Sequence, residues 1–233
     1  NSRLYNLLSG MRMLDIYHDN AFGPLVTTEI FARTLDISIS NCSTLVDVRG
    51  LSHLQELVLK DCPRITDVSC VGARWLELSS CDGIEDVSGL GGVQELDISS
   101  CRNVRTVSVL GHVRKVSVSD CDMLTDVSAL GGVHTLSLWR CRGVTDVRAL
   151  GNVHTLEISH CNNVTDVSAL GSVYKLTLSH CQGITDVSAV GGAHELELSA
   201  CENVVDVRAL GGVHVLRLCC CPGITDVSAL CGV

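Results

Sequence analysis

Residues 131–150 read GGVHTLSLWRCRGVTDVRAL, and residues 151–170 read GNVHTLEISHCNNVTDVSAL. The two stretches match at most positions, and a recurring cysteine marks the same pattern along the chain. Its spacing is 20 residues throughout, except for 19 residues between Cys62 and Cys81. A fixed period of this length predicts a tandem array in which each unit stacks on the next. The marking residues are Cys42, Cys62, Cys81, Cys101, Cys121, Cys141, Cys161, Cys181, Cys201 and Cys221.

Each unit is expected to contain a short strand, a turn and a brief return segment. Leu136 and Leu138 lie two residues apart, which is the period of a strand with one buried face. Val144 and Val147 flank a Thr-Asp turn, and the return segment ends at Leu150. The apolar positions lie 8, 5 and 3 residues before the cysteine, at the cysteine, and 3, 6 and 9 residues after it. Such a small apolar face closes a core only by stacking on both neighbours.

The motif L-x-L-x-x-C-x-x-[IV]-T-D, as it stands from Leu156 to Asp166, resembles the cysteine-containing leucine-rich repeat. The resemblance implies a curved, right-handed solenoid with a parallel sheet on its concave side. The fold class is then α/β-type by architecture but dominated by β structure. The units are shorter than those of the best-known cysteine-containing repeats and leave no room for a full helix. We therefore expect turns, 3-10 or extended segments on the convex side.

The tandem repeats are predicted to cover residues 35–233. Residues 1–34 fit a single atypical N-terminal repeat or cap, because Leu8, Met11, Leu14 and Ile16 keep a degenerate apolar pattern. Residues 20–33 break the period and are interpreted as an insertion. Val233 occupies the first apolar position of a further repeat, which predicts an uncapped C-terminal edge. An open edge of this kind can pair with another chain, so end-to-end contact is one expected interaction.

Composition restricts the expected partners and location. The chain has 17 basic and 26 acidic residues and a net charge of -9, which argues against nucleic acid, since binding to phosphates needs a basic surface. A basic protein partner is easier to accommodate. No run of 18 apolar residues is present, so no membrane insertion is expected. A regular series of free thiols favours a reducing compartment, cytoplasmic or nuclear.

Stacked repeats turn each repeat position into a column, and two columns offer candidate chemistry. The cysteine column could hold metal, but four ligands must then converge on one point, so we interpret the cysteines as small buried residues of the turn. An aspartate column runs through Asp146 and Asp166 and could bind calcium. A turn residue that accepts hydrogen bonds from local backbone amides is the preferred interpretation. Glycine pairs such as Gly131-Gly132 are expected to allow a tight bend before each strand.

Two further features invite a functional interpretation. A histidine column, formed by His134, His154, His194 and His214 with Tyr174 inside it, should lie at the surface, where protonation would make it pH-sensitive. A solvated, duplicated position is the alternative, and zinc would lack a designed geometry there. The run Cys219-Cys220-Cys221 breaks the pattern. A nucleophilic or metal-binding Cys219 near His214 has no third group to orient it, so exposed, unreactive thiols are expected.

The positions 6, 4 and 2 residues before each cysteine should point out of the concave sheet. Both tryptophans of the chain occupy such positions, and exposed aromatics often dominate binding energy at interfaces. Acidic residues near the first tryptophan would suit a basic partner. The candidate partner-binding residues are Trp75, Glu77, Glu95, Asp97, Trp139, Glu157, Tyr174, Lys175, Glu195 and Glu197.

The preferred function is a non-enzymatic scaffold that binds a protein partner on the concave face. The resemblance also allows a substrate receptor or a regulatory subunit of a signalling enzyme, and a structural component of a larger assembly is a third alternative. None of the common catalytic or phosphate-binding motifs is present, and the polar residues lie in columns, whereas catalysis needs unlike groups around one pocket. We therefore expect no catalytic residues, no cofactor and no metal.

Overall fold

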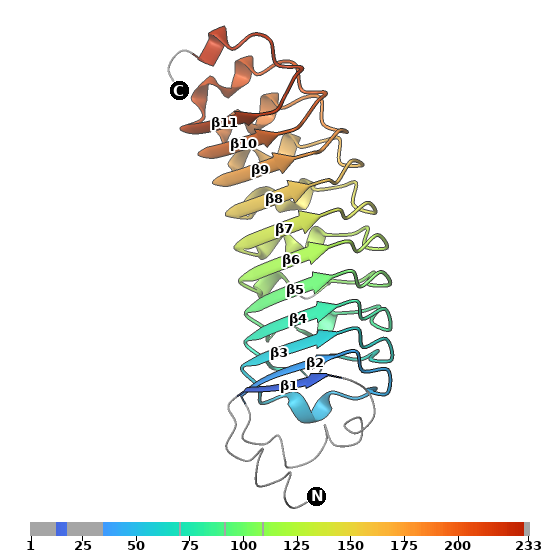
Figure 1. Cartoon of the computed structure of the whole chain (residues 1–233). Coiled ribbons are helices and arrows are strands. Elements are labelled where there is room, and N and C mark those ends of the chain that lie inside the picture. The colour runs from blue at the N-terminus through green and yellow to red at the C-terminus, as the bar shows by residue number, and fades with distance from the viewer. Residues whose placement is uncertain (1–12, 18–34, 70, 91, 109, 231–233) are drawn as a thin grey trace, which may run out of the picture.

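The computed structural model describes residues 13–17, 35–69, 71–90, 92–108 and 110–230. Its strands form a single parallel sheet of 11 strands in sequence order, so that every strand lies beside its neighbours in the chain (Figure 1). The predicted solenoid is confirmed. The strands are β1 (Met13–Tyr17), β2 (Asp36–Ser40), β3 (Glu56–Lys60), β4 (Trp75–Ser79), β5 (Glu95–Ser99), β6 (Lys115–Ser119), β7 (Thr135–Trp139), β8 (Thr155–Ser159), β9 (Lys175–Ser179), β10 (Glu195–Ser199) and β11 (Val215–Cys219).

Neighbouring strands pair without any shift, so that equivalent residues of successive repeats lie side by side. Leu136 of β7 pairs with Leu156 of β8, for example. The register survives the one short repeat, because Glu56 of β3 still pairs with Trp75 of β4. The missing residue is therefore absorbed outside the sheet, and every repeat position forms an unbroken column.

The core is the continuous apolar face that the period predicts. In β7, Leu136 and Leu138 are fully buried, and the residues between and beside them face outward. The turn valines and the last leucine of each return segment complete the layer, as Val144, Val147 and Leu150 do. Such burial stabilises by about 25 cal/mol per Å² of apolar surface. At the end of the sheet, the leucines of β11 are only partly buried.

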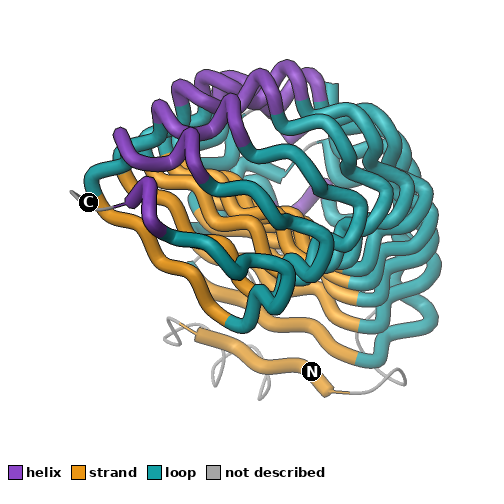
Figure 2. Tube along the Cα trace, turned by 90° about the horizontal axis from the view of Figure 1, so that it is seen from above, coloured by secondary structure: helices purple, strands orange, loops and turns teal. Residues whose placement is uncertain are grey.

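Short 3-10 turns form the side opposite the strands, in agreement with the prediction for the return segment (Figure 2). Successive turns stack on one another as the strands do. They are η2 (Arg49–Leu51), η3 (Ser88–Leu90), η4 (Leu110–His112), η5 (Ser128–Gly132), η6 (Arg148–Asn152), η7 (Ser168–Ser172), η8 (Ser188–Gly192), η9 (Arg208–Gly212) and η10 (Ser228–Leu230).

The glycines at these turns serve a different purpose from the one predicted. None of the glycines in the column of Gly151 and Gly171 has the positive φ that only glycine adopts easily. Instead, a Cβ on Gly171 would lie 2.3 Å from the carbonyl oxygen of Ala189 in the next turn. Close stacking of backbones, and not a tight bend, therefore requires glycine here.

The chain leaves each strand through a left-handed corner that the sequence pattern did not reveal. The residue before each column cysteine has a φ between 49° and 57°, and none of these residues is glycine. From Asn41 to Ala200, the backbone N–H of the corner residue donates to the next strand, as that of Arg140 does to the carbonyl oxygen of Ser159 at 2.9 Å. The corner residues are Asn41, Asp61, Ser80, Ser100, Asp120, Arg140, His160, His180, Ala200 and Cys220.

The N-terminal expectation is only partly within the described residues. β1 continues the sheet beside β2, and Ile16 of β1 is buried. Leu8, Met11 and the insertion predicted at residues 20–33 lie outside the described residues. The boundary of a cap at residue 34 stays a prediction.

Candidate functional site

The cysteine column lies inside the solenoid. From Cys42 to Cys201 the column thiols are buried, and all the described cysteines are free. Each thiol from Cys141 onward donates both to a carbonyl oxygen at the end of its own strand and to one in the preceding strand. Cys161, for example, donates to Ser159 at 3.5 Å and to Leu138 at 3.7 Å. Burial raises the pKa of Cys121 and of Cys181 to about 12, so these thiols stay protonated and act as parts of the core.

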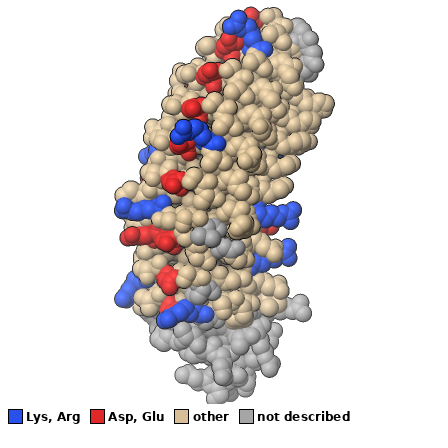
Figure 3. Space-filling model, turned by 180° about the vertical axis from the view of Figure 1, so that it is seen from behind, with Lys and Arg blue, Asp and Glu red and all other residues tan. Residues whose placement is uncertain are grey.

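The aspartate column accepts hydrogen bonds from local backbone amides at the start of the 3-10 turns, as the sequence predicted, and these contacts are here called the aspartate caps. One carboxylate oxygen accepts the backbone N–H two residues later, as Asp166 does from Ser168 at 2.9 Å. An arginine at that later position adds an ion pair, which Asp146 forms with Arg148. The hydrogen bonds and charge of Arg148 lower the pKa of Asp146 to about 2. The acidic side chains rise along the back of the molecule, accompanied at intervals by basic ones (Figure 3).

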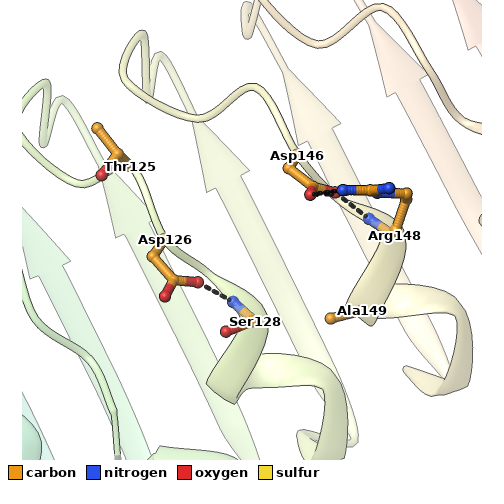
Figure 4. Close-up of a pocket in the computed structure, with 6 residues that line it drawn as sticks. All are labelled: Thr125, Asp126, Ser128, Asp146, Arg148 and Ala149. Carbon is orange, nitrogen blue, oxygen red and sulfur yellow. Dashed lines mark hydrogen bonds and ion pairs between the residues drawn. The ribbon is translucent and has the colours of Figure 1, made fainter.

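A shallow depression between two neighbouring caps is shown in Figure 4 and is lined by residues of η5, η6 and the turns before them. Its acidic groups are already engaged: Asp126 accepts from the N–H of Ser128, and Asp146 pairs with Arg148. An equivalent depression recurs around Asp186 and Asp206. Within the described residues, no group of three or more His, Cys, Asp or Glu is arranged to hold a metal ion. The depressions thus follow from repetition, and their carboxylates are bound to the turns.

The outward positions of the strands, here called the sheet face, carry most of the predicted partner-binding residues. Trp75 begins β4 and Trp139 ends β7, so the two tryptophans lie at opposite edges of the sheet face and three strands apart. Both are half-buried. Glu157 is exposed at the centre of β8, where it accepts a hydrogen bond from Ser137 at 3.4 Å. Glu197 has the same central position in β10.

The acidic residues near Trp75 are partly compensated by lysines. Glu77 of β4 pairs with Lys60 of β3 at 2.7 Å. Asp97 is adjacent to Glu77 in the register, and burial together with that neighbour raises its pKa, whereas Lys115 lowers it. Glu95 lies between Trp75 and Lys115 in the same register. The structure therefore brings the predicted acidic residues together, but as a mixed patch and not as a purely negative one.

A second mixed cluster lies toward the other end of the sheet. Glu195 of β10 contacts Lys175 of β9 at 3.2 Å and Arg217 of β11 at 3.9 Å. All three side chains are on the sheet face, where such exposed pairs contribute little to stability.

Tyr174 lies just before β9, at the edge where the strands begin, and belongs to a stack of rings. His134, His154, Tyr174, His194 and His214 form this entry stack, with successive ring centres 4.6, 4.7, 4.5 and 4.6 Å apart. The structure thus places the predicted histidine column on an edge of the sheet face. His134 and His154 each place Nδ1 3.2 Å from the hydroxyl of the following threonine.

A second aromatic cluster lies at the edge where the strands end, and the sequence analysis missed it. The ring of His160 meets that of Trp139 edge-on at 5.7 Å and stacks on that of His180 at 4.2 Å. The guanidinium of Arg140 lies 4.0 Å from the centre of the Trp139 ring, a favourable cation–π contact. The signal available in the sequence was that His160 and His180 lie one repeat apart, which places their side chains next to each other.

The cysteine run near the end of the sheet divides as the pattern suggests. Cys219 and Cys220 are exposed, whereas the column residue Cys221 is half-buried. Cys221 still donates to the carbonyl oxygen of Leu198 at 3.5 Å, so it keeps the column's contacts.

A parallel sheet, one strand per repeat, 3-10 return turns and a ladder of buried cysteines together define a leucine-rich-repeat solenoid. No family model and no curated protein matches the chain. Among solved structures, it is similar to internalin C2 from Listeria monocytogenes, with a TM-score of 0.50 and 19% identity over 92% of this chain and 83% of that one.

The chain is also similar to the functional domain of InlJ from Listeria monocytogenes, which includes a cysteine ladder. The TM-score is 0.51 at 14% identity, and the match covers 82% of this chain but only 50% of that one. At these identities the likeness shows the fold alone. Among the described residues, no helix is long and apolar enough to span a membrane.

Proposed function

We propose that this protein is a non-enzymatic scaffold that binds a protein partner on the sheet face. One observation carries the proposal: both tryptophans occupy outward strand positions and not the inward apolar positions, which recur in ten repeats. Large aromatic side chains on a largely polar, regular surface are typical anchors of a protein interface. A solenoid also presents an extended surface to a partner.

The charge pattern suggests how a partner would be oriented. The mixed patch around Trp75 contains Glu77, Glu95 and Asp97 beside Lys60 and Lys115. A partner with basic residues opposite these carboxylates would replace the weak pairs with intermolecular ones. The central carboxylates Glu157 and Glu197 extend the acidic character toward β10. A basic protein segment that lies across the strands is therefore the partner we favour.

The first experiment compares capture of partners from a lysate of the source by three forms of the protein. They are the parent chain, a Trp75→Ala/Trp139→Ala double variant, and an Arg148→Ala/Arg208→Ala control on the opposite side of the solenoid. We expect a captured protein to be retained by the control and lost by the double variant. Truncation of such an anchor typically costs at least about 2 kcal/mol of binding free energy, which is roughly 30-fold in affinity.

Thermal melts of the three forms separate loss of binding from loss of fold. The tryptophans are only half-buried, so the double variant should melt as one cooperative transition close to the parent. Capture that survives in the double variant but fails in the control would place the interface on the 3-10 side and reject the sheet face. Purification of the captured protein and measurement of its affinity for each form then complete the test.

A further inference from the structure

Two histidines are held side by side at the end of neighbouring strands by the hydrogen-bonded backbone of the corner. His160 follows β8 and His180 follows β9, and both are corner residues with φ of 56° and 53°. The N–H of His160 donates to the carbonyl oxygen of Ser179 at 2.9 Å, and that of His180 to the carbonyl oxygen of Ser199 at 2.8 Å. These bonds fix both Cα atoms, so the two side chains leave the solenoid together.

The two rings are also oriented alike by their neighbours. Their centres are 4.2 Å apart and their planes differ by 10°. Nδ1 of His160 lies 3.0 Å from the hydroxyl of Ser159, and Nδ1 of His180 lies 2.9 Å from that of Ser179. When one ring nitrogen is held by a hydrogen-bond partner, the other is left as the ligating atom. Both rings therefore present Nε2 as the unengaged nitrogen.

The surroundings of His160 favour its neutral form. Burial, then His180 and Arg140, lower the pKa of His160. His180 is more exposed, and the guanidinium of Arg140 lies over Trp139.

We propose that His160 and His180 form a two-imidazole site for one divalent transition-metal ion of the Ni²⁺, Cu²⁺ and Zn²⁺ group. Imidazole nitrogen suits this group of ions and bonds to Zn²⁺ at about 2.0–2.1 Å. A tetrahedral ion then needs ligand nitrogens about 3.4 Å apart, so the stacked rings must tilt toward each other. Rotation about the side-chain bonds supplies that tilt and exchanges ring stacking for coordination; His180 is exposed and His160 is half-buried.

The proposed site is incomplete in a defined way. Within the described residues there is no third His, Cys, Asp or Glu arranged with the pair. The remaining coordination positions are therefore left to water or to a ligand from outside. Such a site binds reversibly, and Ni²⁺ and Cu²⁺ should bind more tightly than Co²⁺ or Mn²⁺, following the usual order of divalent affinities.

Trp139 provides a local reporter for this site. Its ring is 5.7 Å from that of His160, and a bound paramagnetic Ni²⁺ ion quenches nearby indole fluorescence. The experiment uses the whole chain carrying Trp75→Phe, so that Trp139 is its single tryptophan. NiCl₂ is titrated at neutral pH, and Ni²⁺ is preferred to Cu²⁺ because it does not oxidise the exposed thiols of Cys219 and Cys220.

We expect saturable quenching that EDTA reverses. Replacement of one ligand, His160→Asn or His180→Asn, should weaken binding by at least about tenfold, the order of effect seen when a metal site is impaired. Asparagine is a suitable replacement because it tolerates positive φ and already occupies the same corner at Asn41. The fold should therefore be retained, which a thermal melt without metal checks.

The entry stack supplies the matched control. His134 and His154 are also stacked, at 4.6 Å, but they lie at the opposite end of their strands from Trp139. The His134→Asn/His154→Asn variant should leave the Trp139 titration unchanged. Quenching that is unsaturable, or equally strong in the His160→Asn and His180→Asn variants, would overturn the proposal. As a second readout, NiCl₂ should raise the melting temperature of the Trp75→Phe protein more than that of the single-ligand variants.

Discussion

The thiol of Cys181 lies 3.4 Å from the carbonyl oxygen of Ile158, which belongs to the preceding strand. A second bond of 3.3 Å joins it to Ser179 at the end of its own strand. One side chain thus links two repeats at the point where the chain turns out of the sheet. The same pair of contacts recurs at Cys161 and Cys201, so the column joins adjacent repeats through side chains as well as through the backbone.

The column predicts a large difference in thiol reactivity. Because thiolate is the reactive species, buried thiols with a raised pKa, such as Cys121 and Cys181, should react slowly with iodoacetamide in the native protein. Cys219 and Cys220 are exposed and should react first. Peptide mass spectrometry after timed labelling assigns the modification to each residue. Labelling of Cys181 as fast as that of Cys219, without denaturant, would contradict the burial of the column.

Glycine at the 3-10 turns should be essential where turns stack and dispensable elsewhere. Gly171→Ala places a Cβ about 2.3 Å from the carbonyl oxygen of Ala189, so the backbones must separate. Overpacking of this kind typically costs about 1–3 kcal/mol, or roughly 2–4 °C of melting temperature per kcal/mol in a chain of this size. The control is Gly92→Ala, where a Cβ meets nothing within 4 Å. Equal melting temperatures for the two variants would reject the stacking explanation.

Acid should destabilise the protein through the aspartate caps. The pKa of Asp146 and of Asp206 is lowered to about 2 in the folded chain by hydrogen bonds and charge from Arg148 and Arg208. A group with a depressed folded pKa stabilises above its unfolded pKa of about 3.9, and that contribution is lost as pH falls toward the folded value. The melting temperature should therefore decline between about pH 4 and pH 2.

The caps can be tested directly with an Asp146→Asn/Asp206→Asn variant. Asparagine can still accept the backbone N–H but carries no titrating charge. The variant should melt below the parent at pH 6, and its further decline on acidification should be smaller. An Arg148→Gln/Arg208→Gln variant keeps both carboxylates and should show an intermediate decline. A parent and an asparagine variant with parallel pH profiles would mean that these two caps do not contribute to acid sensitivity.

Opposite faces of one strand should respond differently to the same charge. Leu136 is fully buried in β7, whereas Thr135 beside it points outward. Leu136→Asp buries a carboxylate without a partner and should cost more than about 4 kcal/mol, at the severe end of single substitutions. Thr135→Asp, next to Lys115 in the register, should stay near the parent. Chemical denaturation followed by circular dichroism measures both, and similar midpoints would contradict the assigned faces.

The sequence predicts the sheet well because its signals are duplicated. Leucines two residues apart identify the strand, and the recurring cysteine sets the register. The short return segment excludes a helix, and the structure has 3-10 turns there. A pattern read once would be ambiguous between strand and turn, but the same pattern in phase along the chain leaves a single arrangement.

The left-handed corner could not be predicted in the same way. Serine, histidine, arginine and alanine all occupy it, and these residue types do not indicate a positive φ as glycine or asparagine would. The neighbouring strand imposes the corner, through N–H bonds such as that of Arg140 to Ser159. Tertiary contacts therefore decide a conformation that local preference disfavours by about 1–2 kcal/mol per residue.

The candidate sites depend on contacts that a column does not specify. The column places the histidines at one repeat position but does not show whether their rings stack. Position 106 of the aspartate column carries a threonine, and the structure shows which group takes over the role of the carboxylate. The N–H of Ser108 there meets the hydroxyl of Ser88 at 3.3 Å, one repeat earlier. A neighbouring repeat thus replaces the missing cap, which no local pattern indicates.

The unshifted register has a mechanical consequence. Each described strand is hydrogen-bonded to the strands of adjacent repeats, so a force that pulls the two ends apart can detach the outermost repeat by breaking its contacts with a single neighbour. An extended chain spans at most about 3.3–3.6 Å per residue, and a released unit of 20 residues therefore lengthens the molecule by roughly 65 Å. Stretched in this way, the protein should lengthen in equal steps, one step for each repeat that is released.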